Sequence, residues 1–156
     1  MPELIVRDAQ FPQDSEEVLG IWREFVASPT VSLDFQGNEA EFASLPGKYA
    51  PPGGRVLLAV SAKAVVGCVA MRRVDDTICE MKRLYVRPAA RGGGVGRMLV
   101  ERLIEEARLA GYGEMRLDVL AEFDRAQQIY RDIGFTDAEP VSFNPLPGTR
   151  VLGLLL

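Results

Sequence analysis

A glycine-rich turn separates a β-rich segment from an amphipathic one, and it reads Arg91-Gly92-Gly93-Gly94-Val95-Gly96-Arg97. Before it, Ile78–Arg87 has the composition of a strand and ends at Pro88, which lacks the N–H that a sheet ladder needs. After it, apolar residues recur at helical spacing until Gly111. The expected apolar stripe consists of Val95, Met98, Leu99, Leu103, Ala107 and Ala110. This stretch predicts a strand, a tight turn and a helix.

The glycines of this turn are hard to explain by folding alone, because each weakens a helix start by about 1 kcal/mol relative to alanine. Backbone amides without side chains can converge on an anion at the positive end of the helix dipole. Arg91 and Arg97 flank the turn and can add charge to phosphate oxygens. The pattern favours a phosphate site, with a merely flexible connection as the structural alternative.

Two other phosphate-binding loops do not match these residues. A Rossmann fingerprint that starts at Gly92 needs glycine where Arg97 stands. A P-loop from Gly92 needs the same glycine, followed by Lys-Ser/Thr in place of Met98-Leu99. Both motifs are therefore excluded.

Strand and helix patterns alternate through the rest of the chain. The expected strands are Leu4–Val6, Val56–Ser61, Ala64–Arg72, Ile78–Arg87, Met115–Leu120, Val141–Phe143 and Arg150–Leu155. Besides the helix after the glycine turn, three more are expected, at Asp14, at Asn38 and over Asp124–Ile133. Asp14 with Glu17, and Asn38 with Glu41, have the spacing of capping boxes.

The order of these elements predicts a mixed α/β fold. The two strands of the unit Ile78–Leu120 should be parallel, because such crossovers are right-handed. The runs around Ala62 should form an antiparallel hairpin. No stretch has the composition of a linker, so one domain over residues 1–156 is expected.

Charge is distributed unevenly along the chain. The net charge is −4, yet Arg72–Arg97 holds seven basic and three acidic residues, which leaves −8 on the remainder. An acidic protein with one basic segment is a poor general nucleic-acid binder but suits a small polyanion. The sequence therefore predicts no nucleic-acid partner.

Other absences narrow the function classes further. The chain has no histidine and two cysteines, which removes His-based triads and most zinc chemistry, so no metal site is expected. Cys68 lies in an apolar run and should be buried. No apolar stretch is long enough for a bilayer, and no secretory signal is visible after Met1. A cytoplasmic protein without a membrane partner is expected.

Three motifs resemble those of the GNAT superfamily of acetyl-CoA-dependent N-acetyltransferases. Arg91-Gly92-Gly93-Gly94-Val95-Gly96 matches the family's Arg/Gln-x-x-Gly-x-Gly/Ala signature. The segment Glu80–Pro88 looks like its fourth strand, and Ala126–Tyr130 with Gly134-Phe135 looks like its late helix and Gly-Phe turn. The resemblance covers nearly the whole chain in element order. It implies an α/β (α+β) fold with a mostly antiparallel sheet of about seven strands, a splayed parallel pair at strands four and five, and about four flanking helices.

The resemblance implies acetyl-CoA, or coenzyme A, as the co-substrate and assigns residues to it. The pyrophosphate should be bound at Gly92, Gly93, Gly94, Val95, Gly96 and Arg97, with Arg91 beside them. The main chain of Leu84, Tyr85 and Val86 should pair with the pantetheine arm. This requires a strand edge that is open toward its parallel neighbour, and a bulge near Val86 would help to open it.

The resemblance also suggests two catalytic residues. Tyr130 occupies the position of the acid that protonates the leaving thiolate. Glu80, six residues before Val86, is the candidate base, and strand alternation should place it on the same face as Lys82, Leu84 and Val86. A semi-buried helix tyrosine and an exposed strand glutamate are the structural alternatives. One departure is Phe123, where many members carry asparagine that contacts the cofactor, so apolar packing is expected there.

The sequence says less about the acceptor, because enzymes that share one fold act on many different acceptors. A primary amine of a small or amino-acid-like molecule is expected, attacked directly in a ternary complex, and a homodimer is left open. Asp34, Glu39, Glu41 and Asp118 are candidates to attract it, each with a surface or capping role as the alternative. A non-catalytic acyl-CoA-binding sensor and a nucleotide-binding regulator are the rival functions.

Overall fold

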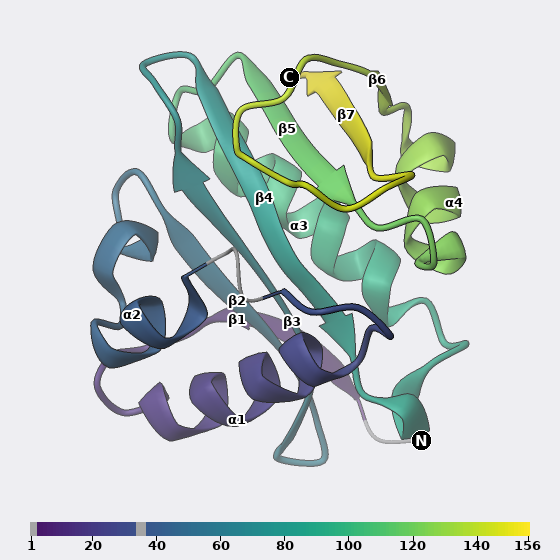
Figure 1. Ribbon diagram of the computed structural model, residues 1–156. Helices are drawn as coiled ribbons and strands as arrows, with labels where there is room; N and C mark the ends of the chain where they lie inside the picture. The colour runs from purple at the N-terminus through teal and green to yellow at the C-terminus, as the bar shows by residue number, and fades with distance from the viewer. Residues whose placement is uncertain (1–2, 34–36) are drawn as a thin grey trace.

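A seven-stranded sheet with the order β1-β2-β3-β4-β5-β7-β6 forms the centre of the molecule (Figure 1). The computed structural model describes residues 3–33 and 37–156. The strands are β1 (Leu4–Asp8), β2 (Arg55–Ser61), β3 (Ala64–Arg73), β4 (Ile78–Val86), β5 (Glu114–Val119), β6 (Thr136–Asp137) and β7 (Arg150–Leu155). Neighbours pair antiparallel except β4 and β5, which are parallel. The expected mixed, mostly antiparallel fold is confirmed.

Helices cover both faces of this sheet (Figure 1). They are α1 (Ser15–Ala27), α2 (Asn38–Ala43), α3 (Val95–Leu109) and α4 (Asp124–Ile133), with short 3₁₀ turns η2 (Gly47–Tyr49) and η3 (Pro88–Ala90). One core lies under α1 and α2 around Trp22, and it contains Cys68, fully buried as expected. The other lies under α3 and α4 around Leu103. Among the described residues, no helix is long and apolar enough to cross a membrane.

Several local expectations were wrong. Met98 and Ala110 are exposed, because the buried arc of α3 runs instead through Val100 and Ile104. Neither capping box forms. The Asp14 carboxylate accepts hydrogen bonds from Arg7 and from the amide of Gln10. Asn38 donates its side-chain amide to the carbonyl of Leu33, and Gly37 with φ 68° precedes the helix.

The expected strand Val141–Phe143 is also wrong. On the side of β7 away from β5, the pairing strand is the two-residue β6, and residues 138–149 form a loop. This loop contains Pro140, Pro145 and Pro147, none of which can donate to a ladder. Instead, two of its side chains donate hydrogen bonds to the sheet, Ser142 to Glu80 and Asn144 to Asp118.

A β-bulge interrupts β4. Cys68 pairs with Tyr85 and Ala70 with Lys82, so Arg83 and Leu84 together oppose one residue of β3. Arg83 has φ 59°, the left-handed conformation. A bulge near Val86, as expected, is therefore present, two to three residues before it.

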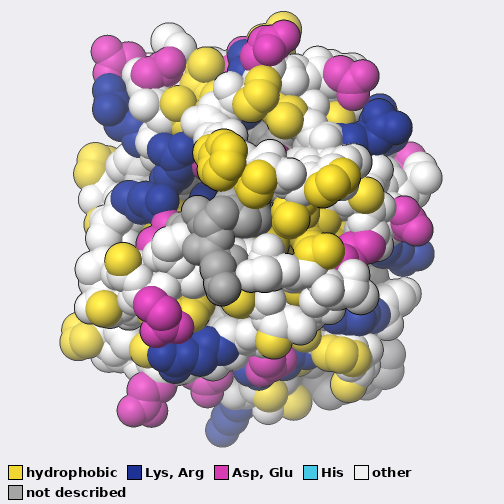
Figure 2. All heavy atoms as spheres, viewed as in Figure 1, with side chains coloured by type: hydrophobic (Ala, Val, Ile, Leu, Met, Phe, Trp, Pro, Cys, Tyr) yellow, Lys and Arg dark blue, Asp and Glu magenta, His cyan; other side chains and the backbone are white. Residues whose placement is uncertain are grey.

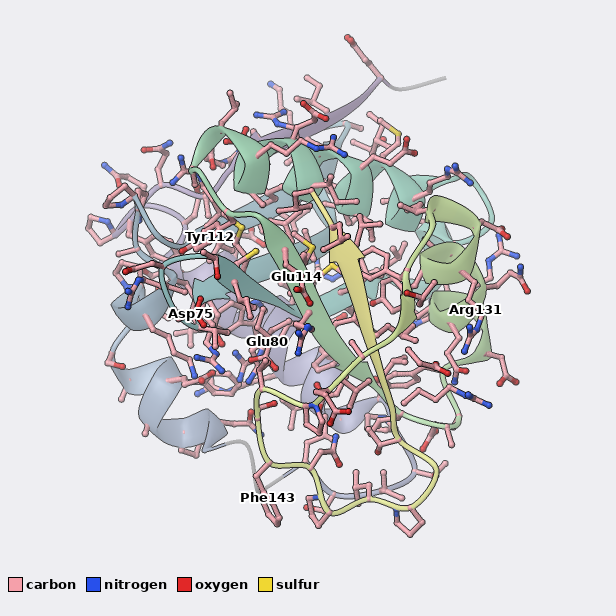
Figure 3. The ribbon with its side chains drawn as sticks, turned by 90° about the horizontal axis from the view of Figure 1, so that it is seen from above. Asp75, Glu80, Tyr112, Glu114, Arg131 and Phe143 are labelled. Atoms are coloured by element: carbon pink, nitrogen blue, oxygen red, sulfur yellow. The ribbon has the colours of Figure 1, made fainter. Side chains whose placement is uncertain are left out.

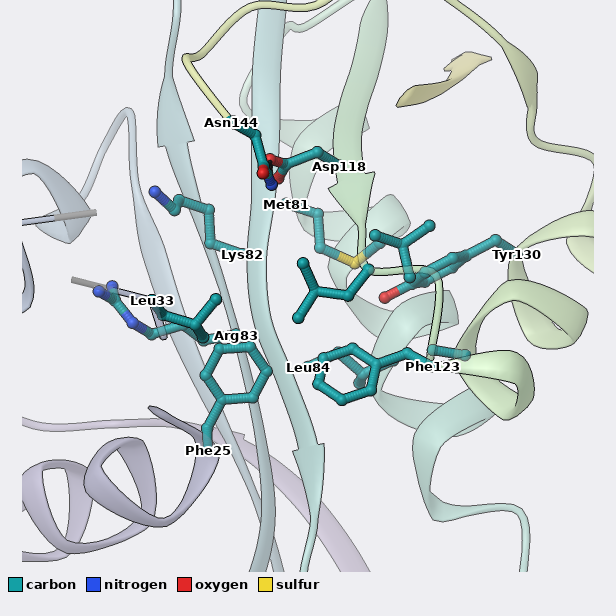
Figure 4. A pocket seen from close by; sticks show the side chains of 13 residues that line it. Phe25, Leu33, Met81, Lys82, Arg83, Leu84, Asp118, Phe123, Tyr130 and Asn144 are labelled. Carbon is teal, nitrogen blue, oxygen red and sulfur yellow. Dashed lines mark hydrogen bonds between the residues drawn. The ribbon is translucent and has the colours of Figure 1, made fainter. Parts of the chain in front are cut away.

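The bulge shifts the alternation of side chains along β4. Glu80 and Arg83 point to the α1–α2 face, whereas Leu84 and Val86 pack against the core under α3. The expectation that Glu80 shares a face with Leu84 and Val86 was therefore wrong, because one extra residue reverses every later position. Lys82 and Arg83, although adjacent, leave the strand on the same side (Figure 4).

Candidate active site

The strands β4 and β5 separate in the middle of the sheet. Their register covers three pairs, from Ile78 with Glu114 to Glu80 with Arg116, although β4 continues to Val86 and β5 to Val119. Beyond Glu80 the edge of β4 that faces β5 is therefore open. The expected splayed pair is confirmed, and it creates a cleft.

Side chains from two strands, two helices and the adjoining loops line this cleft, which has a volume of about 50 Å³ (Figure 4). Met81 and Leu84 come from β4, Tyr130 from α4, and Asp118 from β5. Phe25 from α1 lies at its mouth. The lining is mostly apolar, with polar groups at the end near Asn144.

The main chain of Leu84, Tyr85 and Val86 runs along this opening, where the pantetheine arm is expected. The Tyr85 ring packs edge-on against Phe25, with ring centroids 6.3 Å apart. The carbonyl of Val86 accepts a hydrogen bond of 2.8 Å from Nε of Arg91. Arg91 thus ties the glycine turn to the end of β4, and its guanidinium lies over the Tyr85 ring.

The glycines of the turn meet different requirements. Gly92 and Gly94 have φ of 89° and 82°, which side chains disfavour. A Cβ on Gly96 would lie 3.2 Å from the Ile129 side chain, so Gly96 permits close packing of α3 on α4. Gly93 has neither constraint: its φ is not positive, and a Cβ there would meet nothing nearer than 4.0 Å. Folding therefore explains three of the glycines but not Gly93.

The remaining residues of the turn are differently placed. Val95 is buried at the start of α3 and contributes packing. Arg97 is exposed and pairs with Glu101 one turn along the helix, at 3.0 Å. The turn before α3 is thus exposed and is flanked by the positive charges of Arg91 and Arg97.

Tyr130 lies at the inner end of the cleft, and Figure 4 shows its hydroxyl pointing into it. The ring packs on Phe135, with centroids 5.6 Å apart. Burial, with a smaller effect of the negative charge on Asp118, raises the pKa of Tyr130. Its hydroxyl is therefore a proton donor throughout the neutral range.

Phe123 contributes apolar packing at the position where many GNAT members carry asparagine. Its ring is 6.1 Å from that of Phe25, across the opening between β4 and α4. Beside it, the carboxylate of Glu122 accepts hydrogen bonds from the amide and the hydroxyl of Thr30, at 3.0 and 2.8 Å. These contacts join the segment after α1 to the residues just before α4.

A larger cavity, of about 350 Å³, adjoins the cleft and shares Asp118 and Asn144 with it. Residues of the loop 140–149 line it, and Figure 3 shows Glu80 next to this loop, with Phe143 at its outer end. Glu80 is 1% exposed and accepts hydrogen bonds of 2.8 Å from Nε of Arg72 and from the Ser142 hydroxyl. It is therefore not the exposed strand glutamate of the structural alternative.

Asp118 is the second carboxylate of this cavity. Asn144 donates a hydrogen bond of 2.7 Å to it from the loop. Burial raises the pKa of Asp118, and the nearby charge of Glu80 adds to the rise, against the effect of Asn144. Asp118 is thus a stronger proton acceptor than an ordinary carboxylate.

The other acidic candidates lie elsewhere. Asp34 is outside the described residues. Glu39 is exposed on α2. Glu41 is bound to Arg83 and Lys48, both at 2.5 Å, and these cations outweigh burial and hold its pKa below the usual value. Of the three that the structure describes, Asp118 lines the site.

Sequence reasoning missed Lys82 and Arg83. Two consecutive basic residues in β4 break the alternation of polar and apolar residues, and this was the available signal for a bulge. Arg83 is 3% exposed; besides Glu41 it binds Tyr49 and Asn38, and its guanidinium lies 4.4 Å above the Trp22 ring. Within residues 3–33 and 37–156, no group of three or more potential metal ligands occurs.

Known proteins share both the sequence pattern and the architecture. The model of the Acetyltransferase (GNAT) family matches residues 19–135. An uncharacterized N-acetyltransferase of Schizosaccharomyces pombe is 36% identical over 147 residues, which cover 93% of this chain and 90% of that protein.

Solved structures show the same fold. The acetyltransferase of Streptococcus agalactiae superposes with a TM-score of 0.78 at 22% identity, over 98% of both chains. The yncA protein of Salmonella typhimurium, solved with its cofactor acetyl-CoA, has a TM-score of 0.69 at 24% identity, over 97% of this chain and 93% of that one. With its splayed β4–β5 pair and its glycine turn, the chain belongs to the GNAT family of acetyltransferases and is an acyltransferase.

Proposed function

We propose that the protein transfers an acetyl group from acetyl-CoA to a primary amine of a small, amino-acid-like molecule, by direct attack in a ternary complex. The observation that carries this proposal is the separation of β4 from β5 beyond Glu80, directly before an exposed glycine turn. The open main chain of Leu84–Val86 suits an extended arm, and the amides of Gly92–Arg97 suit its diphosphate. The acetyl-CoA in the yncA structure supports the same choice.

Acetyl-CoA supplies an activated acetyl thioester, and the residues of this chain then have two proton transfers to perform. The acceptor enters through the larger cavity, and its ammonium, with a pKa of about 10, must lose a proton before attack. Glu80 is our assigned base, and Asp118, in the same cavity, is the competing one. Amides of β4 stabilise charge that develops on the thioester oxygen, and Tyr130 protonates the departing thiolate.

Free-thiol release from acetyl-CoA, measured across a panel of amino acids, other small primary amines and peptides, tests the proposal. We expect release with at least one small amine. Tight acetyl-CoA binding without release for any amine would instead identify an acyl-CoA-binding module. Competition by ATP at comparable affinity would point to a nucleotide-binding regulator.

Gly93→Ala tests the turn as the diphosphate site. Because a Cβ on Gly93 would meet nothing nearer than 4.0 Å and φ is not positive, we expect the free energy of unfolding to change by less than about 0.5 kcal/mol. Coenzyme A affinity, measured by calorimetry, should fall about tenfold, because the new methyl group keeps the diphosphate from the amides. Gly20→Ala, in the middle of α1, is the matched control and should leave affinity unchanged. Equal affinities of the two variants would remove Gly93 from the site.

Glu80→Gln tests the base. Glutamine keeps an oxygen that accepts from Arg72, and its NH2 group can donate to the Ser142 hydroxyl, but it cannot take a proton. The limb of the pH–rate profile that rises toward alkaline pH should therefore flatten. Asp118→Asn is the comparison, measured over the same pH range. If Glu80→Gln leaves the profile intact and Asp118→Asn flattens it, the proton goes to Asp118.

A further inference from the structure

Lys82 stands out among the cations on the α2 side of β4. Figure 2 shows Lys and Arg side chains gathered over the end of β3 and α2, next to the apolar surface at the centre of this face. Three cations near Lys82 have partners: Arg72 binds Glu80, and both Lys48 and Arg83 bind Glu41. Lys82 makes no hydrogen bond or ion pair within the described part of the chain, although it is half-buried and lines the cleft.

The surroundings of Lys82 disfavour an uncompensated positive charge. Burial lowers the pKa of Lys82, and the positive charges of Lys48 and Arg83 lower it further, against the opposing effect of Glu80 and Glu41. A buried cation is stable when an anion pairs with it. The cleft thus contains a cationic position that an anionic group of a ligand would stabilise.

Charges of the opposite sign lie next to this position. Asp118 lines the cleft together with Lys82, and it lines the larger cavity together with Glu80. A ligand that carries both an ammonium group and a carboxylate would complement these charges. Its ammonium group would point toward Asp118 and Glu80, and its carboxylate toward Lys82. We infer, on the basis of the function proposed above, that the acceptor is an amino acid or a related amine that carries a carboxylate, and that Lys82 binds this carboxylate.

The same arrangement disfavours other amine acceptors. A polyamine would place a second cation near Lys82, Lys48 and Arg83, where like charges repel. A simple monoamine would leave Lys82 without a partner. Lys82 is therefore a residue that determines specificity, and it takes no part in bond making.

The test compares amino acids with their decarboxylated amines, each pair having the same side chain. For the wild-type enzyme, kcat/KM should favour the amino acid about tenfold or more. Lys82→Met should lower kcat/KM for the amino acid about 10- to 100-fold, mainly through KM, because a charge-assisted contact is lost. For the decarboxylated amine, kcat/KM should change less than about twofold in the same variant.

Two further variants and one binding measurement serve as controls. Lys82→Arg keeps the charge and should restore most of the preference, and Lys63→Met, in the exposed β2–β3 turn, should have no effect. Calorimetric binding of the amino acid to the enzyme–coenzyme A complex should weaken in parallel in Lys82→Met. Equal losses for both members of a pair, or a wild-type preference for the decarboxylated amine, would overturn the inference while leaving acetyl transfer intact. No turnover of either member would remove the acetyl transfer itself, and this inference with it.

Discussion

Replacing Tyr130 with Phe is expected to lower kcat about 100-fold at neutral pH, while the affinity for acetyl-CoA changes less than about twofold. General acids contribute roughly 10²- to 10⁴-fold, and the lower end applies because a thiol with a pKa of about 8.5 leaves readily. The phenylalanine ring keeps the packing on Phe135, so the loss concerns the hydroxyl alone. Single-turnover kinetics and calorimetry measure the two quantities separately.

The pH dependence and a matched control accompany this prediction. Because burial raises the pKa of Tyr130, the hydroxyl stays protonated, and the wild-type rate should not fall through its ionisation below about pH 10. In Tyr112→Phe, a hydroxyl that donates to the carbonyl of Gly53 is lost far from the cleft. That variant should lose about 1 kcal/mol of unfolding free energy and keep its turnover. An unchanged chemical rate in Tyr130→Phe would remove Tyr130 as the acid.

Replacing Arg83 with Met should destabilise the fold by about 3 kcal/mol. Removal of one partner from a buried ion pair leaves the other without its counter-charge, which costs about 3–5 kcal/mol, and Lys48 still compensates part of the charge on Glu41. The melting temperature should fall by roughly 6–12 °C. Denaturant unfolding measures the free energy directly.

A double substitution distinguishes lost charge pairing from lost packing. If the unpaired Glu41 carboxylate causes the cost, Arg83→Met with Glu41→Gln should be more stable than Arg83→Met alone. Arg108→Met, which breaks an exposed pair with Glu105, should cost less than about 1 kcal/mol. A cost for Arg83→Met as small as that of Arg108→Met would contradict the prediction.

The sequence alone identified the elements that depend on local patterns. The helix Asp124–Ile133 has the bounds that were expected, because apolar spacing and Gly134 both act within a few residues. The glycine turn and the start of α3 at Val95 were recognised for the same reason. The parallel β4–β5 pair followed from one chirality rule. The family signature in Arg91–Gly96 needed no tertiary information.

Only the tertiary structure decided how the cavity is built. One additional residue at Arg83–Leu84 reverses the side chains of β4, and no local propensity specifies where such a bulge falls. The loop 140–149 lies over the sheet because Ser142 reaches Glu80, 62 residues away, and Asn144 reaches Asp118, 26 residues away. Glu80 and Lys82 share a face of β4 through local alternation, but Asp118 joins them only because β5 lies beside β4. Local sequence determines secondary structure, whereas the charges that meet in the site are set by long-range packing, which spacing along the chain does not encode.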